Sequence, residues 1–314
     1  MPISSNFIRF LILIERKIVR IPRSRNAKIV SIYTYMGFNM GSLGGYLKDL
    51  ENKAVYIINE AFASFKKPAT LWSTGKDSTL LLYLITKVAG HPEIPVIHLD
   101  TGFKFPEIYE FRDKIAREWN LNLVISRNDD LDITPFKVDR FTCCHHRKTL
   151  NLRKVIEENG FDAIFVAIRW DEHGIRGKER HFSPRDENML WDYRNQPIEI
   201  GDLYQTEYPS AHHVRVHPII DWPLEAVWRY TLVKDLPVNP LYFKGYSSLG
   251  CWPCTKPTIP EEQWYPIYQL YLEGRKREAL EKLIPMVVNV TERSGRAQDK
   301  EKELMQKLRF LGYM

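Results

Sequence analysis

The chain has 314 residues and a mass of 37.0 kDa, with 44% hydrophobic and 12% aromatic residues, so it can bury a full core and is not disordered by composition. The formal net charge of +6 lies in residues 1–35, which hold seven basic side chains and one acidic one, whereas residues 36–314 hold 38 of each sign. Because the body of the chain is neutral, its bulk charge indicates no particular partner.

Residues 1–39 are predicted to be a basic extension. Their apolar run FIRFLILI is too short to span a bilayer and lacks the flanks of a signal peptide, so we expect no membrane anchor and a cytoplasmic protein. Since Met36 and Met40 precede a more regular helical pattern, the segment is interpreted as an upstream extension of the reading frame, which is either not part of the native protein or disordered. The alternative is a basic arm that touches a membrane or a polyanion.

Residues 40–235 are predicted to form an α/β nucleotide-binding domain. Apolar spacing predicts helices over 46–65, 77–88, 106–119 and 147–159, and strands over 69–72, 94–99, 121–125 and 162–168. Strands that alternate with helices imply crossover connections, which run between parallel strands. The sequence therefore predicts a doubly wound, mostly parallel sheet that is covered on both faces.

The pattern changes after Arg169, where a polar stretch with little periodicity continues to about residue 213. Loops of this length inside a domain are usually functional or disordered. Helices return from residue 216, and we expect Trp222 and Trp228 to pack in the core. Residues 236–314 are predicted to form a C-terminal region with two cysteines and a helical tail.

The turn after the first predicted strand reads Ser-Thr-Gly-Lys-Asp-Ser. It is not a Walker A loop, because Asp77 follows Lys76 and residue 70 is Thr rather than Gly. Unpaired amides at a helix start attract anions, hydroxyls and a lysine add donors, and glycine lets the backbone approach closely. The alternative is an ordinary strand-to-helix connection. The predicted phosphate-binding residues are Ser73, Thr74, Gly75, Lys76, Asp77 and Ser78.

A second group follows the second predicted strand. Asp100, Thr101 and Gly102 end a strand at the same edge of the sheet as the phosphate turn, where open α/β sheets bind ligands. We therefore expect them to line the nucleotide pocket. The alternative for Asp100 is a helix cap.

Charged residues gather after the strand predicted over 162–168. Arginine and lysine in a loop can clamp phosphate or sulfate, and the alternative is ordinary solvated surface charge. The cluster comprises Arg169, Asp171, Glu172, Arg176, Lys178, Glu179, Arg180 and Arg185. From the turn and this cluster we predict the catalytic residues Lys76, Asp77, Arg169, Asp171, Arg176 and Arg180.

The four cysteines form two pairs, Cys143 with Cys144 and Cys251 with Cys254. In a cytosolic protein, such clustering indicates metal binding rather than disulfides. Four thiolates suit a [4Fe–4S] cluster and also tetrahedral zinc, and inert buried thiols are a third reading. His145 and His146 are interpreted as loop or helix-start residues.

Several blocks carry a family resemblance. The turn STGKDS, HLDTGFKFPEIYEFRD, FDAIFVAIRWDEHGIRGKERHFSPRD, RVHPIIDWPLEAVWRY and the ending RSGRAQDKEKELMQKLRFLGYM resemble the PP-loop (N-type) ATP pyrophosphatases. The likeness is to the small subunit of bacterial sulfate adenylyltransferase and to adenylylsulfate and phosphoadenylylsulfate reductases. It covers the chain from about Tyr46 onward. It implies an adenine nucleotide alpha hydrolase-like fold, an oligomer, and cleavage of ATP between its α and β phosphates with Mg²⁺.

The cysteine blocks CCHHRKTLNL and LGCWPCTKP are similar to the cluster-binding blocks of the reductases, which favours [4Fe–4S] over zinc. The reductases use a further cysteine near the C-terminus as nucleophile, but none follows Cys254. Sulfate adenylyltransferase, in turn, needs no cluster.

This combination of blocks resembles the sulfurtransferases of the superfamily. It implies an enzyme that adenylates an acceptor for sulfur insertion, with DNA as the favoured acceptor (phosphorothioation) and a cysteine desulfurase as sulfur donor. The alternatives are sulfate adenylyltransferase paired with a GTPase subunit, a reductase-like protein, and a non-enzymatic scaffold that carries a cluster and binds nucleotide.

Overall fold

A six-stranded sheet forms the centre of the fold in the computed structural model, which describes residues 40–172 and 176–296. The strand order is β3-β2-β1-β4-β6-β5. Every pair is parallel except β5 with β6. The strands are β1 (Pro68–Leu71), β2 (Pro95–Asp100), β3 (Asn122–Arg127), β4 (Ala163–Phe165), β5 (Phe182–Arg185) and β6 (His213–Val216). The predicted doubly wound, mostly parallel α/β fold is confirmed.

Helices follow the predicted alternation. The crossover helices lie close to their predicted bounds, and π-helical turns extend two of them, over Leu84–Val88 and His145–Leu150. His145 and His146 thus lie inside a helical segment. The helices are α3 (Met40–Ser64), α4 (Lys76–Tyr83), α5 (Pro106–Glu118), α6 (Arg140–Cys144), α7 (Asn151–Asn159), α8 (Leu224–Val233), α9 (Glu261–Leu272) and α10 (Lys276–Val288). Among the described residues, no helix combines the length and the apolar character needed to cross a bilayer.

Both faces of the sheet are covered by apolar side chains. Successive strand residues point to opposite faces, so Ala163 and Phe165 of β4 join one core cluster and Ile164 joins the other. The first cluster holds residues of α3, α4 and α8, and the second holds residues of α7. Trp222 is buried in the first cluster, as predicted.

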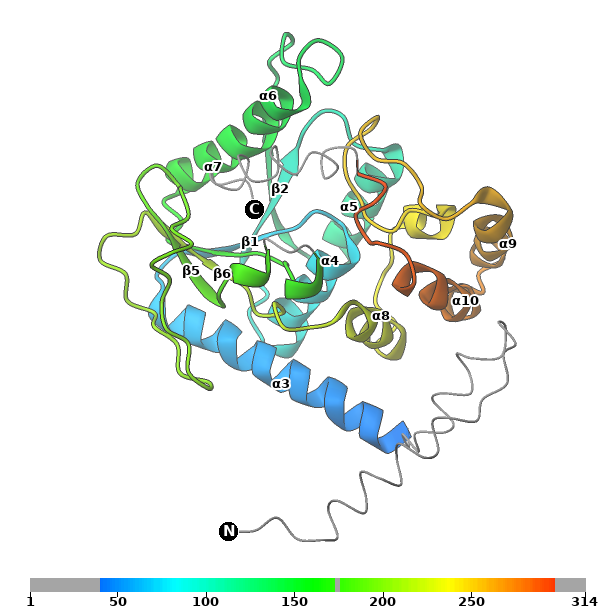
Figure 1. The fold of residues 1–314 in the computed structure, drawn as a ribbon, viewed down its shortest axis with the longest axis horizontal. Helices are drawn as coiled ribbons and strands as arrows, with labels where there is room; N and C mark the ends of the chain where they lie inside the picture. Colours follow the sequence, from blue (N-terminus) through cyan, green and yellow to red (C-terminus); the bar gives the residue numbers. More distant parts are fainter. Residues whose placement is uncertain (1–39, 173–175, 297–314) are drawn as a thin grey trace, which may run out of the picture. The chain divides into compact units, whose positions relative to one another are not determined.

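The C-terminal helices form a third apolar cluster. In Figure 1, α9 and α10 lie side by side next to α8. This cluster also contains Trp228 of α8, which is fully buried, as predicted. The end of the predicted helical tail, residues 297–314, and the basic extension 1–39 lie outside the described residues.

The polar stretch between residues 169 and 213 is more ordered than its sequence suggests. It contains the edge strand β5, which the absence of periodicity hid. The strand has only four residues and includes Pro184, which is tolerated because β5 pairs with β6 on one side only. Its other residues are buried although two of them are polar, so no alternation of apolar and polar side chains marks it.

The position of β1 determines where a ligand can bind. The chain passes from β1 outward to β2 and β3 and then returns to β4 on the other side of β1. In open α/β sheets, such a reversal leaves a crevice at the carboxyl ends of the two strands, and ligands bind there.

Candidate active site

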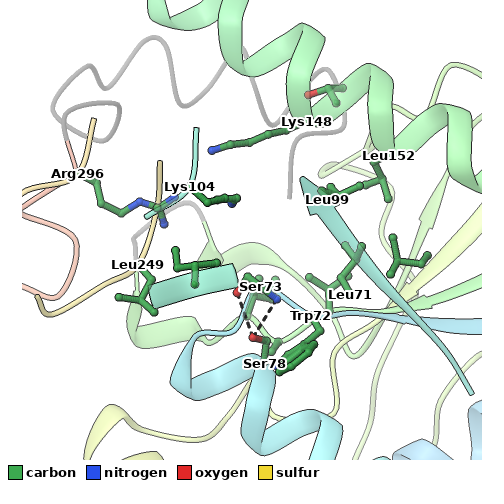
Figure 2. Close-up of a pocket in the computed structure, with 17 residues that line it drawn as sticks. Leu71, Trp72, Ser73, Ser78, Leu99, Lys104, Lys148, Leu152, Leu249 and Arg296 are labelled. Atoms are coloured by element: carbon green, nitrogen blue, oxygen red, sulfur yellow. Dashed lines mark hydrogen bonds between the residues drawn. The ribbon is translucent and has the colours of Figure 1, made fainter. Parts of the chain in front are cut away.

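A cavity lies at the carboxyl ends of β1, β2 and β4 (Figure 2). One part of its wall is apolar, made of Leu71, Ile97, Leu99, Leu152, Val166 and Ile168. Ser73 and Ser78 of the turn before α4 lie in the same wall. The cavity therefore joins an apolar slot to the turn that was predicted to bind phosphate.

Three basic side chains complete this cavity. Lys104, Lys148 and Arg296 come from three separate segments, and in Figure 2 they lie near one another on another side of the cavity from Ser73 and Ser78. Burial lowers the pKa of Lys104, and the neighbouring charges of Lys148 and Arg296 lower it further. An apolar slot with a cationic end suits a ligand that has a flat apolar part and an anionic part.

Hydrogen bonds shape the phosphate turn. The hydroxyls of Ser73 and Ser78 are 3.0 Å apart, and the Ser78 hydroxyl donates to the carbonyl of Gly75 at 3.1 Å. Thr74 has a φ of 64°, a backbone conformation that costs free energy for a residue with a side chain. Both predicted serines thus face the cavity from a strained turn.

The two charged residues of the turn, Lys76 and Asp77, form a buried ring of charges with Arg169 and Glu292. Lys76 Nζ donates to Asp77 Oδ2 at 2.8 Å and to Glu292 Oε1. Arg169 Nη2 donates to Glu292 Oε2 at 2.5 Å, and its Nη1 donates to Asp77 Oδ1. The ring therefore holds two cations and two carboxylates, and its formal charges cancel.

The backbone of Lys76 is also bound from outside the turn. Its N–H, the first amide of α4, donates to the hydroxyl of Tyr242 at 3.0 Å. Lys76 was predicted to converge with the serines on an anion. In the structure the serines line the cavity, whereas the Lys76 ammonium lies in the charge ring.

The pKa values of the ring follow from these contacts. Burial alone would lower the pKa of Lys76, but the carboxylates of Asp77 and Glu292 outweigh it and raise the pKa above its usual value. Burial alone would raise the pKa of Asp77, but Arg169 and Lys76 hold it at about 2. All four groups are therefore charged at neutral pH.

Asp100, Thr101 and Gly102 shape the end of β2 and are not among the residues that line the cavity at the carboxyl ends of β1, β2 and β4. Asp100 Oδ1 accepts from the amide of Gly102 and from the hydroxyl of Tyr109, each at 2.8 Å. Burial would raise the pKa of Asp100, but these donors lower it. Thr101 Oγ1 lies 3.2 Å from Cys251 Sγ, so this turn leads to the cysteines instead.

Most members of the charged cluster predicted after residue 168 form ion pairs with one another. Arg169 Nε donates to Asp171 at 2.9 Å, and Arg176 Nη1 donates to Glu172. The latter carboxylate also accepts from Arg293 at 2.7 Å. These pairs place Asp171 and Arg176 next to the charge ring, whereas residues 173–175 lie outside the described residues.

The rest of that cluster lies by β5. Glu179 is fully buried and binds Arg185 Nη2 at 3.0 Å and the Ser183 hydroxyl at 2.7 Å. Arg180 is half-buried, and its carbonyl accepts from His217 at 2.7 Å. Lys178 is exposed, as expected for a solvated surface residue. Arg185 is therefore occupied by Glu179 and is not an open clamp for an incoming anion.

The four cysteines all line a second cavity. Its wall contains Cys143, Cys144, Cys251 and Cys254 together with Thr101, Phe103, Pro135, Arg140, Arg147 and Lys148. None of the four cysteines is in a disulfide. Within residues 40–172 and 176–296, no three His, Cys, Asp or Glu side chains converge closely enough to hold one metal ion.

The thiols of this cavity differ in acidity. Burial raises the pKa of Cys143 to about 11. Burial acts in the same direction on Cys251, but Lys148 and Lys104 outweigh it and lower that pKa to about 7. Lys148 lines both cavities, so the cysteine cavity adjoins the cavity that contains Ser73 and Ser78.

Sequence reasoning missed several residues of these sites. They are Lys104, Lys148, Tyr242, Glu292 and Arg296. Two signals were present: Lys104 follows Gly102 closely, and Lys148 follows the first cysteine pair. Arg296 lies in the ending that carried the family resemblance and Glu292 directly precedes that ending, but nothing local connects them to a turn more than 200 residues earlier.

The fold and the turn at its switch point define the class of the protein as a PP-loop enzyme. A family model described as the phosphoadenosine phosphosulfate reductase domain matches residues 67–257, which is more than half of the chain. The chain therefore belongs to this family, and the predicted membership of the PP-loop ATP pyrophosphatases is confirmed.

Relatives within the family give a narrower view. The chain is 31% identical over 294 residues to "Sulfate adenylyltransferase subunit 2" of Zymomonas mobilis, covering 82% of this chain and 93% of that one. It is 40% identical over 203 residues to the protein of the same name from Rhodopseudomonas palustris, covering 63% and 62%. Among solved structures, Candida glabrata FMN adenylyltransferase is similar in fold, with a TM-score of 0.54 at 18% identity, covering 84% of this chain and 92% of that one.

Proposed function

We propose that this protein is an adenylyltransferase that joins AMP from ATP to an oxyanion of sulfur, with sulfate as the first candidate. In this reaction a sulfate oxygen attacks the α phosphorus, the bond from that phosphorus to the bridging oxygen breaks, and pyrophosphate leaves with the electron pair. The proposal is supported by the sulfate adenylyltransferase subunits among its relatives. The observation that carries it is the cavity that joins an apolar slot, a serine-rich turn and three cations.

Each part of the cavity has a role in this proposal. The apolar slot between Leu71 and Leu99 would hold the adenine, and Ser73 and Ser78 would donate to the phosphates. Mg²⁺ brought with ATP would neutralise part of the leaving charge. Lys104 and Arg296 would hold the anion that attacks. The earlier favoured prediction, sulfur insertion into DNA, has less support from the relatives than this alternative.

A sulfurtransferase is the second candidate, because one observation favours it specifically. Four cysteines from two distant segments line one cavity next to the nucleotide cavity. Four thiolates with Arg140, Arg147 and Lys148 fit a [4Fe–4S] cluster, since the cations would offset its negative charge. When bound, such a cluster would supply electron or sulfur transfer. Zinc is the alternative and would require all four sulfurs to converge on one ion.

The two candidates imply different partners. An adenylyltransferase of this type would act with a larger GTPase subunit, whereas a sulfurtransferase would need a cysteine desulfurase and an acceptor such as DNA. Copurification from the native host, with the partners identified by mass spectrometry, would separate these cases. We also propose that the protein acts in the cytoplasm as an oligomer, which light scattering can check for the assembly.

The test is to measure pyrophosphate and nucleotide products from MgATP with and without sulfate. We expect sulfate-dependent pyrophosphate and adenylylsulfate, both lost in Ser78→Ala and retained in the matched control Ser64→Ala, where the exposed serine at the end of α3 is changed. Retention of these products after all four cysteines are changed to serine supports the adenylyltransferase, whereas pyrophosphate release that needs the cysteines and an acceptor other than sulfate supports the sulfurtransferase. Formation of ADP instead of AMP products would contradict both.

A further inference from the structure

A short C-terminal segment, residues 291–296, contributes to the nucleotide site. Its Glu292 belongs to the charge ring and its Arg296 lines the nucleotide cavity. Its backbone is fixed on the second cysteine segment, because the amide of Lys256 donates to the carbonyl of Gly295 at 3.0 Å. A Cβ on Gly295 would lie 2.3 Å from Lys256 O, so the two segments are in direct contact.

Glu292 is held from several directions. Its carbonyl accepts from the Ser247 hydroxyl at 2.5 Å, and its side chain is almost fully buried. One carboxylate oxygen accepts from Lys76, 216 residues earlier, and the other from Arg169, 123 residues earlier. The carboxylate therefore joins two cations that belong to different crossovers of the sheet.

The two carboxylates of the ring are not equivalent. Asp77 is the sequence neighbour of Lys76, so it moves with the phosphate turn, whereas Glu292 is attached to a separate segment. Because the ring is neutral as it stands, an anion that is to bind Lys76 and Arg169 has to compete with Glu292. Removing the charge of Glu292 would leave these four groups with one net positive charge, with Asp171 still paired to Nε of Arg169.

We infer that Glu292 is a positioning residue of the phosphate site, which fixes Lys76 and Arg169 and weakens their hold on pyrophosphate so that the product leaves. This inference rests on the proposed function, because it assumes that the turn binds the pyrophosphate part of ATP. Glu292 touches neither ATP nor the reacting atoms in this role. It acts through the two cations that it contacts.

The experiment is Glu292→Gln, which keeps the shape and removes the charge. We expect pyrophosphate, measured by calorimetry, to bind roughly ten-fold more tightly, with a lower KM for ATP and a lower kcat. Glu292→Asp keeps the charge on a shorter stem, so pyrophosphate affinity should return close to the wild-type value. The matched control is Glu278→Gln on the exposed side of α10, where the carboxylate pairs with Arg275 and Lys282.

A purely structural role predicts a different result. Glu292→Gln would then lower the melting temperature and leave pyrophosphate affinity unchanged, which would overturn the inference. Should the Gln variant fail to fold, an affinity in Glu292→Asp that is as tight as expected for the uncharged variant would overturn it as well. Absence of sulfate turnover in the wild type, with pyrophosphate still bound ten-fold more tightly by the Gln variant, would remove the proposed function and leave the inference intact.

Discussion

The charge ring at α4 and the four-cysteine cavity lie in neighbouring parts of one molecule but handle charge in opposite ways. In the ring, Lys76 and Arg169 are each matched by carboxylates. In the cavity, the thiols are lined by Arg140, Arg147 and Lys148, and no carboxylate is among the described lining residues. The ring is electrically complete by itself, whereas the cavity is suited to an anionic guest or to thiolates.

The difference explains why the ring can form without a ligand, whereas the cavity is suited to one. Buried ions are costly unless each is paired, so the ring must form completely when the chain folds. In the cavity wall, the buried guanidinium of Arg147 is satisfied in another way. It donates to backbone carbonyls, among them those of Thr101 at 2.8 Å and Asn128 at 2.9 Å. The guanidinium of Arg147 is therefore held by backbone carbonyls.

The largest effect is expected when the ring is broken at its centre. Arg169→Met removes a fully buried cation and leaves Asp77 and Glu292 short of a partner. The free energy of unfolding should fall by about 3–5 kcal/mol, measured by urea denaturation. Arg277→Met, an exposed arginine on α10, is the control and should change stability by less than about 1 kcal/mol. Equal effects of the two changes would mean that the ring is not a structural unit.

A smaller effect is expected when the ring is disturbed from a distance. Gly295→Ala places a Cβ against Lys256 O and pushes away the segment that carries Glu292. The free energy of unfolding should fall by about 1–3 kcal/mol, with lower pyrophosphate release. Gly177→Ala, whose Cβ would meet its nearest atom at 4.0 Å, is the matched control. Normal turnover in Gly295→Ala would mean that the position of segment 291–296 does not affect the phosphate site.

Acid should lower the free energy of unfolding through His98, a buried residue of β2. Burial, with the charges of Lys104 and Arg112, lowers the pKa of His98 to about 3, so the folded protein keeps this histidine neutral. The unfolded chain binds a proton near pH 6.5, so stability present above that pH is lost as pH falls toward 3. The expected loss from this group is about 1.4 kcal/mol per pH unit. Urea denaturation at pH 7 and pH 5.5 should show it, and His98→Gln should reduce the slope; an unchanged slope would assign it to other groups.

The smallest effect on stability is expected in the cysteine cavity. Cys143→Ser changes a half-buried thiol outside the ring, and the metal-free protein should lose less than about 1 kcal/mol. The same change should reduce the iron and acid-labile sulfide of anaerobically purified protein if the cavity holds a cluster. Equal iron content in the variant and the wild type would mean that Cys143 does not bind the iron.

The sequence predicts local features well and distant pairings poorly. Alternating strands and helices predicted the sheet, and the small polar turn at residues 73–78 predicted the serines that face the cavity. The strands β5 and β6 were missed because their buried residues include polar ones, Ser183 and Arg185 in β5 and His213 and Arg215 in β6, which carry no apolar signal.

The partners of the phosphate turn could not be predicted for a different reason. Tyr242 and Glu292 reach Lys76 from 166 and 216 residues away, and only the folded backbone brings them there. A charged residue in a polar ending looks the same whether it faces solvent or closes a buried ring. The predicted division at residue 235 likewise follows a change of pattern, and the contacts of Lys76 cross it.

The contact between Lys76 and Glu292 has a practical consequence for anyone who trims this protein. A fragment that stops at residue 235 would keep every strand that the structure describes and the whole STGKDS signature, yet it would lack Tyr242, Glu292 and Arg296. Such a shortened protein would carry the recognisable motif, but Lys76 and Arg169 would lose the buried carboxylate of Glu292, and its inactivity would say nothing about the chemistry of the intact enzyme.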